Sequence, residues 1–449
     1  MWAGGSGGMA GSFRAVYELA THLSKRFDVT LVFLKDGEPA STVPLDVDGF
    51  RTVECSIGRP PEAEFPGGFL DDYDLLHIWG ASRAILHRSQ SAGALPHCYS
   101  FHSSLEARGI LSRLGSVFEP AVDRITVAGR GVGDYIASEC HLPVEVIPLG
   151  VDTDRFRPMG KEDCRERLGI PDDAFVFGFL GRLWKFDFAL TYRAFKRVKA
   201  LSGRSDCVLV AAGQYDRLRM RGPCWLKDDF VVLPSYPHSL VPSILNSFDV
   251  LLNTSCGVRE GFGLSVLEAM ACAVPVVSVA WDGFKDTVAD GETGRLVDTA
   301  WHSGEPWIRT SQLVDACTAL LKQEALRVEM GRKARDVVAR EFTWTLCGSR
   351  YARLFQAMTD GAAPSSGRGA RRWYDVKTME RLGRSDALPG NVRRAVGNLT
   401  SSRRIGRGWE RTVSDETIDF LPKYRLTRDS RREEYHEKLR REFPFLRQL

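Results

Sequence analysis

Short apolar runs alternate with longer amphipathic stretches along most of this chain. Apolar residues from Phe13 to Leu23 recur at helical spacing and precede the run DVTLVFL at 28–34, which predicts a helix followed by a strand. Further strands are predicted at 74–79, 124–127 and 144–149, and a second series at 175–180, 207–212, 230–233, 249–253 and 274–279. Because these runs are apolar on both faces, they are typical of buried parallel strands with helices on either side. The alternation therefore predicts doubly wound α/β domains.

The series of strands is interrupted at 147–160, where IPLGVDTDRFRPMG has two prolines, two glycines and no periodicity. We expect a domain junction there, and hence two Rossmann-like domains, at 1–148 and 149–360, that face each other across a cleft. Ligands of such sheets bind beyond the carboxyl ends of the strands. Residues 361–449 form a third segment, which begins with the linker-like stretch GAAPSSGRGA.

The tail at 361–449 differs from the rest of the chain in its charge. It contains 21 Lys and Arg against 12 Asp and Glu, a net charge of +9, whereas the whole chain carries a formal charge of +4. Because the whole chain carries so small a net charge, we expect no nucleic acid partner. A helix predicted at 431–442 has a narrow apolar stripe, which favours packing on the rest of the protein over peripheral contact with a membrane.

The sequence also indicates in which cellular compartment to expect the protein. No apolar run approaches the roughly 18 residues that span a bilayer, and the stretch MWAGGSGGMAGSF lacks the basic and apolar regions of a secretory signal. We therefore expect a soluble, cytoplasmic protein. The ten cysteines are scattered without a Cys-x-x-Cys pair, so the sequence favours buried reduced thiols over a zinc site or a disulfide framework.

The clearest functional signal is VREGFGLSVLEAMACAVPVVSV at 258–279. Glu260 precedes a Gly-Phe-Gly turn, and a helix is predicted to begin near Leu264. The two glycines let the backbone approach a ligand, and the free N–H groups of the helix start favour a phosphate. Glu268 would lie on a buried helix face, where a carboxylate needs partners. Hydroxyls of a ribose or sugar would supply them, and a structural ion pair would do so equally well.

A second signal is GRLWK at 181–185, which directly follows the strand predicted at 175–180. Arg182 and Lys185 would therefore project from the carboxyl end of the first strand of the second domain. An arginine fork beside a lysine suits a diphosphate. Two solvated surface cations are the ordinary alternative for such residues.

Six stretches of the chain resemble, in order, the family 4 retaining glycosyltransferases of the GT-B fold. They are GGSGGMAGSFRAVYELATHL, IPLGVDTDRFRP, FGFLGRL, EGFGLSVLEAMACAVPVV, DGETGRLV and FTWTLCGSRYARLF, and the resemblance covers residues 4–358. It implies transfer of a hexose-type sugar, with retention, from a UDP- or GDP-linked donor to an unidentified hydroxyl acceptor. It implies no divalent metal, and no cofactor besides this donor substrate.

The resemblance also implies roles for individual residues. Glu268 would bind the ribose of the donor, and Glu260 would bind hydroxyls of the transferred sugar. Arg182 and Lys185 would neutralise the diphosphate, and His102 would lie by the reacting sugar. The backbone would contact the donor at Gly7, Gly8, Gly261, Phe262, Gly263 and Leu264. His77, at the end of a predicted strand, is interpreted as structural.

The chain departs from the family pattern in four places. Family members begin with an apolar strand before the glycine loop, and here MWAG precedes the loop. We therefore expect either that the start of the sequence is misassigned or that the central strand of the first sheet is shortened or missing. The family has a Lys-Gly pair slightly later after the GRL element, and here the segment WKFDF replaces it. Lys185 therefore matches the family's lysine only to within a residue or two. Ala273 stands where the family usually has glycine, and we expect little consequence of this change. Asp286, in FKDTV, stands where the family usually has glutamate.

Two other functions compete with sugar transfer. The stretch GSGGMA at 5–10, with Asp36 after the next strand, fits the pattern of a dinucleotide-dependent oxidoreductase, although that pattern requires a preceding strand. The oxidoreductase reading leaves Glu260, Glu268 and Arg182 without a role. The third hypothesis is a non-catalytic relative of the glycosyltransferases, in which the basic tail binds a partner or a polyanion.

Overall fold

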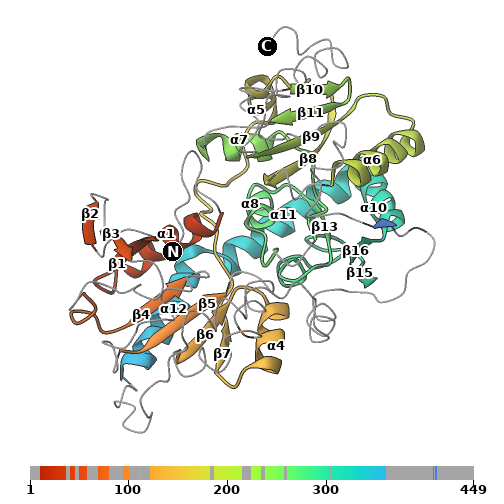
Figure 1. Cartoon of the computed structure of the whole chain (residues 1–449). Helices are drawn as coiled ribbons and strands as arrows, with labels where there is room; N and C mark the ends of the chain where they lie inside the picture. Colours follow the sequence, from red (N-terminus) through yellow and green to blue (C-terminus); the bar gives the residue numbers. More distant parts are fainter. Residues whose placement is uncertain are drawn as a thin grey trace, which may run out of the picture. The chain divides into compact units, whose positions relative to one another are not determined.

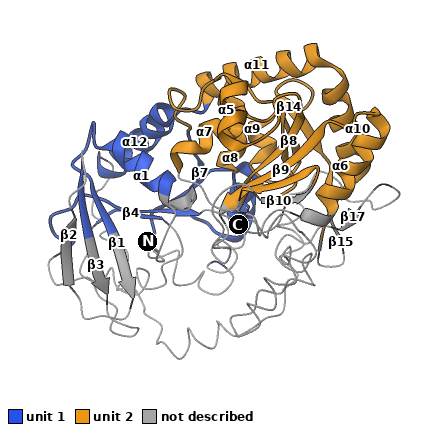
Figure 2. Ribbon diagram, turned by 90° about the horizontal axis from the view of Figure 1, so that it is seen from above, with its two compact units in different colours: residues 1–150, 258–262, 342–399 blue, residues 151–257, 263–341, 400–449 orange. Residues whose placement is uncertain are grey.

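The computed structural model describes the chain at 11–36, 41–45, 50–57, 69–79, 95–101, 111, 122–182, 187–214, 224–233, 238–256, 260–302, 305–360, 408 and 410–411. Figure 1 shows the helices and strands in these ranges. The chain divides into two compact units (Figure 2). Unit 1 comprises Met1–Gly150, Val258–Phe262 and Phe342–Leu399, and unit 2 comprises Val151–Gly257, Gly263–Glu341 and Thr400–Leu449. Neither unit is therefore a continuous stretch of sequence.

Unit 1 contains two sheets. In the first, β3 (Arg51–Ile57) lies between β1 (Thr30–Asp36), to which it is parallel, and β2 (Ser41–Leu45), to which it is antiparallel. The second is parallel throughout, in the order β4 (Leu76–Trp79), β5 (His97–Phe101), β6 (Arg124–Val127) and β7 (Val144–Val146). The strands predicted at 28–34, 74–79, 124–127 and 144–149 are confirmed, with their ends shifted. Among the described residues, no strand joins β1 to β4.

Helices α1 (Gly11–Leu23) and α12 (Trp344–Asp360) pack against each other in unit 1, and α4 (Arg130–Glu139) packs on β6 and β7. The contact of α1 with α12 is close at Gly348, where an added Cβ would lie 2.8 Å from the Cβ of His22. The helix predicted at 13–23 is therefore confirmed, and its apolar residues are buried where it packs on α12.

A buried polar network ties α12 to the second sheet of unit 1. The Tyr351 hydroxyl lies 3.2 Å from Ser100 Oγ and 3.1 Å from Thr126 Oγ1, and His77 Nε2 lies 2.7 Å from Ser100 Oγ. Burial raises the pKa of the Tyr351 phenol, so the hydroxyl stays protonated and can donate. The His77 ring also packs on Phe355, with 5.2 Å between ring centroids. These contacts agree with the structural interpretation of His77.

Unit 2 is built on a seven-stranded sheet in which all neighbours are parallel except β10 and β11. Its spatial order is β10 (Cys224–Lys227), β11 (Phe230–Leu233), β9 (Cys207–Gln214), β8 (Phe175–Arg182), β12 (Val250–Asn253), β13 (Val276–Val279) and β14 (Gly294–Val297). The five strands of the second predicted series are therefore all present. They are buried on both faces, as their composition predicts.

The described part of unit 2 also contains seven helices, four of which connect strands of this sheet and three of which come before or after it in the chain. They are α5 (Lys161–Leu168), α6 (Phe188–Ser202), α7 (Val241–Asn246), α8 (Leu264–Ala271), α9 (Phe284–Thr287), α10 (Thr310–Lys322) and α11 (Glu324–Glu341), with a 3-10 turn at His238–Leu240. Helix α6 packs on α10, and α8 packs on α11. Because α6 links β8 to β9 and α8 links β12 to β13 in opposite directions along the sheet, right-handed crossovers place α6 and α8 on opposite faces.

A buried ion-pair network fixes the start of β12. Asp249 Oδ2 accepts hydrogen bonds from Arg165 Nη2 and from the backbone N–H of Val176, each at 2.7 Å, and Oδ1 accepts one from Lys161 Nζ at 2.6 Å. The side chains of Arg165 and Asp249 are 5% and 8% exposed. Asp249 therefore joins α5, β8 and β12 through one carboxylate.

One part of the tail packs on unit 2. Strands β15 (Thr299–His302) and β16 (Glu305–Ile308) form an antiparallel hairpin, to which β17 (Glu410–Arg411) adds as a third strand. The Gly408 carbonyl accepts hydrogen bonds from Ser311 N and Thr310 Oγ1. The helix predicted at 431–442 lies outside the described residues.

The eight cysteines whose side chains the structure describes are buried free thiols, in agreement with the sequence analysis. They are Cys98, Cys140, Cys164, Cys207, Cys256, Cys272, Cys317 and Cys347. Burial raises the pKa of Cys272 and of Cys347 to about 12, so both remain protonated near neutral pH. None of the helices in the described part of the chain is both long and apolar enough to cross a bilayer.

Candidate functional site

The sheet of unit 2 changes direction at β8. The chain passes from β8 to β9 on one side, whereas β12 pairs with β8 on the other side. In an open α/β sheet, the crevice beyond the carboxyl ends of two such strands is where ligands bind. Strand β8 ends at Arg182, which pairs with Gln214 at the end of β9. The predicted position of Arg182 at the carboxyl end of the first strand of the unit 2 sheet is confirmed.

The segment after β12 is held in place by side-chain hydrogen bonds. Asn253, the last residue of β12, donates from Nδ2 to Ser278 Oγ at 3.2 Å and accepts from the backbone N–H of Ser255 at 3.2 Å. Thr254 Oγ1 lies 3.0 Å from Thr191 Oγ1 of α6. These polar atoms are buried, so their hydrogen bonds fix where the chain leaves the sheet toward Glu260 and α8.

Helix α8 begins at a glycine in the left-handed conformation. Gly263 has a φ of 85° and a ψ of 65°, and a Cβ at this position would lie 1.9 Å from Cε1 of Phe284. The first N–H groups of a helix have no carbonyl partners within the helix. The aromatic ring of Phe284 therefore fixes the turn from which these groups of Leu264 and its neighbours project.

We expect Gly263→Ala to destabilise the protein more than Gly291→Ala does. Both glycines have a positive φ, of 85° and 82°, but nothing lies within 4 Å of a Cβ added at Gly291. The left-handed conformation alone costs about 1–2 kcal/mol for alanine, and the contact with Phe284 adds to that cost only at Gly263. Thermal denaturation of both variants measures the difference. Equal losses of stability would contradict the packing role of Phe284.

Glu268 is a buried carboxylate on α8. Its residue is 4% exposed, and α8 packs against α11, β12, β13 and α7. At the end of α8, Arg335 of α11 donates to the carbonyls of Ala271 and Phe156, which satisfies a helix terminus and places a cation at its negative end. The helix that carries Glu268 is therefore held at both ends.

The turn after α8 is also strained. Ala273 has a φ of 57°, in the region that favours glycine, and a Cβ at Gly331 of α11 would lie 2.1 Å from the Ala273 carbonyl oxygen. The glycine that the family usually has at this position would adopt the left-handed conformation without strain. Alanine here therefore lowers the stability of the protein by about 1 kcal/mol. The turn keeps its shape because α11 packs tightly on it.

The structure places part of the predicted site within unit 2. There it brings the end of β8, at Arg182, to the same sheet edge as the segment that leads to Gly263, Leu264 and Glu268. Glu260, Gly261 and Phe262 lie in Val258–Phe262, a segment of unit 1, and Glu260 is half-buried. The Arg182 side chain and the whole of Gly7, Gly8, His102 and Lys185 lie outside the described residues. Their roles stay predictions.

Sequence reasoning missed Phe284 and Thr254, which position the site without belonging to its motif. Phe284 follows Gly283 at the start of α9, and a lone aromatic residue after a glycine gives no signal of its packing partner. Thr254 follows the apolar strand β12, and that polar residue at a strand end was a usable signal.

Comparison with known proteins gives the family. Residues 174–323 match the family model described as glycosyl transferases group 1, and residues 9–155 match the model described as glycosyltransferase family 4. Similar curated proteins are D-inositol 3-phosphate glycosyltransferases. The one from Stackebrandtia nassauensis is 29% identical over 63% of this chain and 67% of its own length, and that from Corynebacterium jeikeium is 26% identical over 82% and 96%.

Solved structures show the same fold. Sucrose-phosphate synthase from Thermosynechococcus elongatus superposes with a TM-score of 0.60 at 19% identity, covering 78% of this chain and 94% of that one. HepE from Anabaena, in complex with UDP and glucose, has a TM-score of 0.59 at 16% identity, covering 78% and 97%. These matches set the oxidoreductase hypothesis aside. The chain belongs to the group 1, family 4 glycosyltransferases, and it has the GT-B fold.

Proposed function

We propose that this glycosyltransferase moves a hexose-type sugar from a nucleoside diphosphate donor to a hydroxyl acceptor, with retention at the anomeric carbon. The observation that supports this most is the position of two features at one edge of the unit 2 sheet. Strand β8 ends there in Arg182, and β12 leads there to α8, which begins at a glycine and carries buried Glu268. A cation beside a helix N-terminus can bind a diphosphate. A carboxylate one turn further along the helix can accept hydrogen bonds from the two ribose hydroxyls.

In this proposal the protein supplies binding and charge stabilisation. Glu268 accepts hydrogen bonds from the ribose hydroxyls. The backbone N–H groups from Gly261 to Leu264, with Arg182 and Lys185, hold the diphosphate, whose negative charge grows as its bond to the sugar breaks. The departing diphosphate takes the proton of the acceptor hydroxyl on the same face of the sugar, which retains the configuration. Glu260 binds sugar hydroxyls, and no metal ion takes part.

The similar proteins guide the choice of substrates. HepE has been solved with UDP and with UDP-glucose, which favours a UDP-linked donor over a GDP-linked one as the first to test. The curated relatives are named for D-inositol 3-phosphate, a phosphorylated polyol, so we propose a hydroxyl of that chemical class as the acceptor.

We expect Glu268→Ala to weaken donor binding and to leave the fold intact. Loss of hydrogen bonds to a charged acceptor costs about 1.5–3 kcal/mol, which raises the dissociation constant of the donor roughly 10- to 150-fold. Isothermal titration of the purified variant with UDP- and GDP-sugars, alongside its thermal denaturation curve, measures both quantities.

Two further variants make this test decisive. Glu292→Ala removes an exposed carboxylate from the same unit and should bind the donor as the wild type does. Glu268→Gln keeps the shape of the side chain and part of its hydrogen bonding, so it should bind with intermediate affinity. If Glu268→Ala binds every donor normally, the ribose role is wrong. If it unfolds while Glu268→Gln binds normally, the carboxylate is structural.

A further inference from the structure

A short piece of the tail caps helix α10 of unit 2. The Gly408 carbonyl accepts hydrogen bonds from the backbone N–H of Ser311 at 3.1 Å and from Thr310 Oγ1 at 3.0 Å. Both donors lie in the first turn of α10, where N–H groups lack carbonyl partners within the helix, and the N-cap residue Arg309 has no side-chain acceptor. Strand β17 then pairs with β16. The same few tail residues therefore cap a helix and extend a sheet.

The close contact of the tail with α10 requires a glycine at position 408. Gly408 has a φ of 83°, and an added Cβ would lie 2.5 Å from Ser311 Oγ and 2.8 Å from Ser311 Cβ. Alanine at this position would therefore move the tail away from the start of α10. Gly169 is a matched glycine, because its φ is 64° and nothing lies within 4 Å of a Cβ added there. Alanine at Gly169 carries the cost of the left-handed conformation without such a displacement.

The capped end of α10 holds the base of the β15–β16 hairpin. Gln312 Oε1 accepts from the backbone N–H of Asp298 at 2.8 Å, and Gln312 Nε2 donates to Asp298 Oδ2 at 3.1 Å. The backbone N–H of Arg309 donates to the Asp298 carbonyl at 3.0 Å. Asp298 lies between β14 and β15, so these hydrogen bonds fix where the chain leaves the sheet of unit 2. Figure 1 shows α10 beside the hairpin.

From the hairpin base, hydrogen bonds reach the segment that follows β13. Thr299 Oγ1 donates to the Ala280 carbonyl at 2.8 Å, and the backbone N–H of Ala280 donates to the Val297 carbonyl at 2.7 Å. The same segment contains Asp282, which is buried and has a φ of 39°. A residue other than glycine keeps such a conformation only where its surroundings hold it. The hydrogen bonds to the hairpin base help to supply that hold.

The segment after β13 leads to Phe284, whose ring packs against Gly263 at the start of α8. The backbone N–H of Phe284 donates to the Trp281 carbonyl at 3.0 Å, and Trp281 is fully buried. Because the Phe284 ring occupies the place of a Cβ at Gly263, a shift of Phe284 would move the turn from which α8 begins. Described contacts therefore connect Gly408 with the N–H groups that are proposed to bind the diphosphate.

We propose that Gly408 and β17 position the donor site, because they hold the turn at Gly263 through α10, the hairpin base and Phe284. This inference rests on the proposed function, which assigns the diphosphate to the N–H groups around that turn. While the tail is docked, the turn is already ordered, so donor binding costs little further ordering. When the tail is displaced, α10 loses its cap and the turn occupies other conformations. Donor binding then weakens although no group that touches the donor has been removed.

The test uses the full chain and measures binding of UDP and of GDP by isothermal titration. Gly408→Ala should raise the dissociation constant at least about fivefold, which corresponds to a turn that adopts its binding conformation a fifth of the time or less. Thr310→Val loses one of the two donors to the Gly408 carbonyl and should give a smaller rise, of about two- to threefold. Thr310→Ser keeps the hydroxyl and should bind as the wild type does, and so should Gly169→Ala.

Amide exchange tests the same path in the absence of a donor. Gly408→Ala should speed exchange about tenfold at the capped amide and severalfold at the hydrogen-bonded amides further along the path. These amides belong to Ser311, Ala280, Phe284 and Val266. The N–H of Val266 donates to the Gly263 carbonyl at 3.0 Å, so its exchange reports on the turn itself.

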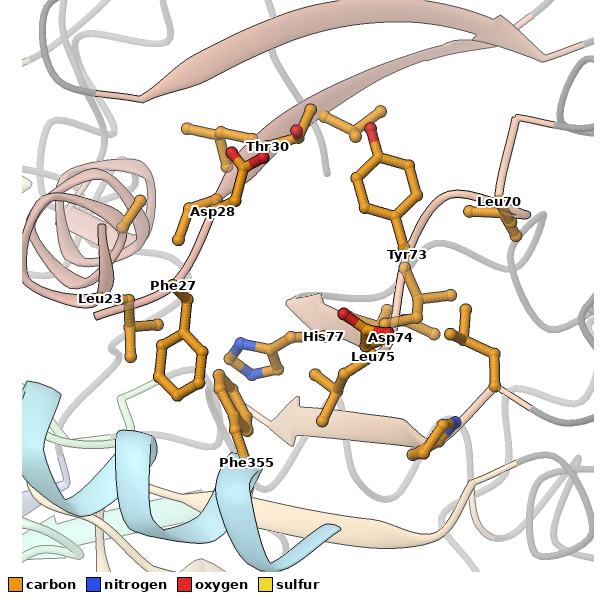
Figure 3. Close-up of a pocket in the computed structure, with 18 of the residues that line it drawn as sticks. Leu23, Phe27, Asp28, Thr30, Leu70, Tyr73, Asp74, Leu75, His77 and Phe355 are labelled. Carbon is orange, nitrogen blue, oxygen red and sulfur yellow. The ribbon is translucent and has the colours of Figure 1, made fainter. Parts of the chain in front are cut away.

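Strand β4 of unit 1 is the internal control for amide exchange. It borders a cavity of about 950 Å³, in whose wall Figure 3 shows His77 and Phe355. A strand beside a cavity has fewer packed neighbours, so it opens readily when the whole protein loses stability. Exchange of β4 in Gly408→Ala should match the wild type, because the tail acts through the path in unit 2.

Several results would overturn the inference. Where the wild type binds UDP or GDP, it fails if Gly408→Ala binds equally tightly, or if Gly169→Ala weakens binding as much. It also fails if exchange speeds up at Ser311 alone, or as much in β4 as along the path. If Gly408→Ala does not fold, equal binding by Thr310→Val and Thr310→Ser contradicts it. A wild type that binds neither nucleotide would contradict the proposed function, whereas faster exchange at Val266 would still show that the tail positions the turn.

Discussion

Arg182→Ala should lower the turnover number for sugar transfer about a hundredfold or more, and it should change donor affinity much less. The reason is that charge on the diphosphate grows in the transition state, so a cation at the end of β8 contributes more there than in the ground state. Steady-state kinetics with a nucleotide sugar, with donor binding measured separately, checks both parts. Arg182→Lys should retain part of the activity, because lysine keeps the positive charge but lacks the forked hydrogen-bond donors of the guanidinium group.

Arg197→Ala is the matched control, because Arg197 is an exposed arginine on α6 of the same unit. It should leave turnover unchanged. Near-normal turnover in Arg182→Ala would show that another cation, or none, neutralises the leaving group. Lys185→Ala, tested in the same way, decides whether the lysine of the displaced segment WKFDF shares this role.

Asp249→Ala should be the most destabilising single change among the buried charges of unit 2. It leaves the Arg165 guanidinium, which is 5% exposed, without its carboxylate and removes the acceptor of the Val176 N–H group. Breaking a buried pair from one side costs about 3–5 kcal/mol. That loss lowers the melting temperature by about 10 °C, which thermal denaturation followed by circular dichroism measures.

Asp336→Ala is the control for this prediction. Asp336 pairs with Arg332 at 2.7 Å, but both side chains are more than half exposed, so the pair is screened by solvent. The melting temperature should stay the same within error. A similarly small change in Asp249→Ala would show that the buried network does not hold α5 to the sheet.

The parallel core of unit 2 could be predicted from the sequence because its strands are buried on both faces. Runs such as 175–180 and 274–279 are apolar at nearly every position. A strand that is buried on both faces needs apolar residues along its whole length, so its sequence reveals it. The start of α8 could also be predicted, because two glycines directly before an apolar helical stretch are typical of a tight turn that leads into a helix. Such signals are local, so each needs no knowledge of the rest of the fold.

The remaining features depend on contacts that are distant in the sequence. Strands β2, β10 and β15 are short and mix polar with apolar residues, so their sequences resemble loops. The apolar stripe of α12 gives no sign that Tyr351 reaches Ser100 and Thr126 of unit 1. Packing of this kind, like that of Phe284 on Gly263, is set by the tertiary fold rather than by local pattern.

The most direct test of the central claim is analysis of the products by NMR. The full chain is incubated with UDP- or GDP-hexoses of known anomeric configuration and with D-inositol 3-phosphate or related polyols. The account predicts release of the nucleoside diphosphate in step with a glycoside whose anomeric proton shows the configuration of the donor. A product of inverted configuration, or no diphosphate release with any donor while Glu268→Ala behaves as the wild type, would contradict it.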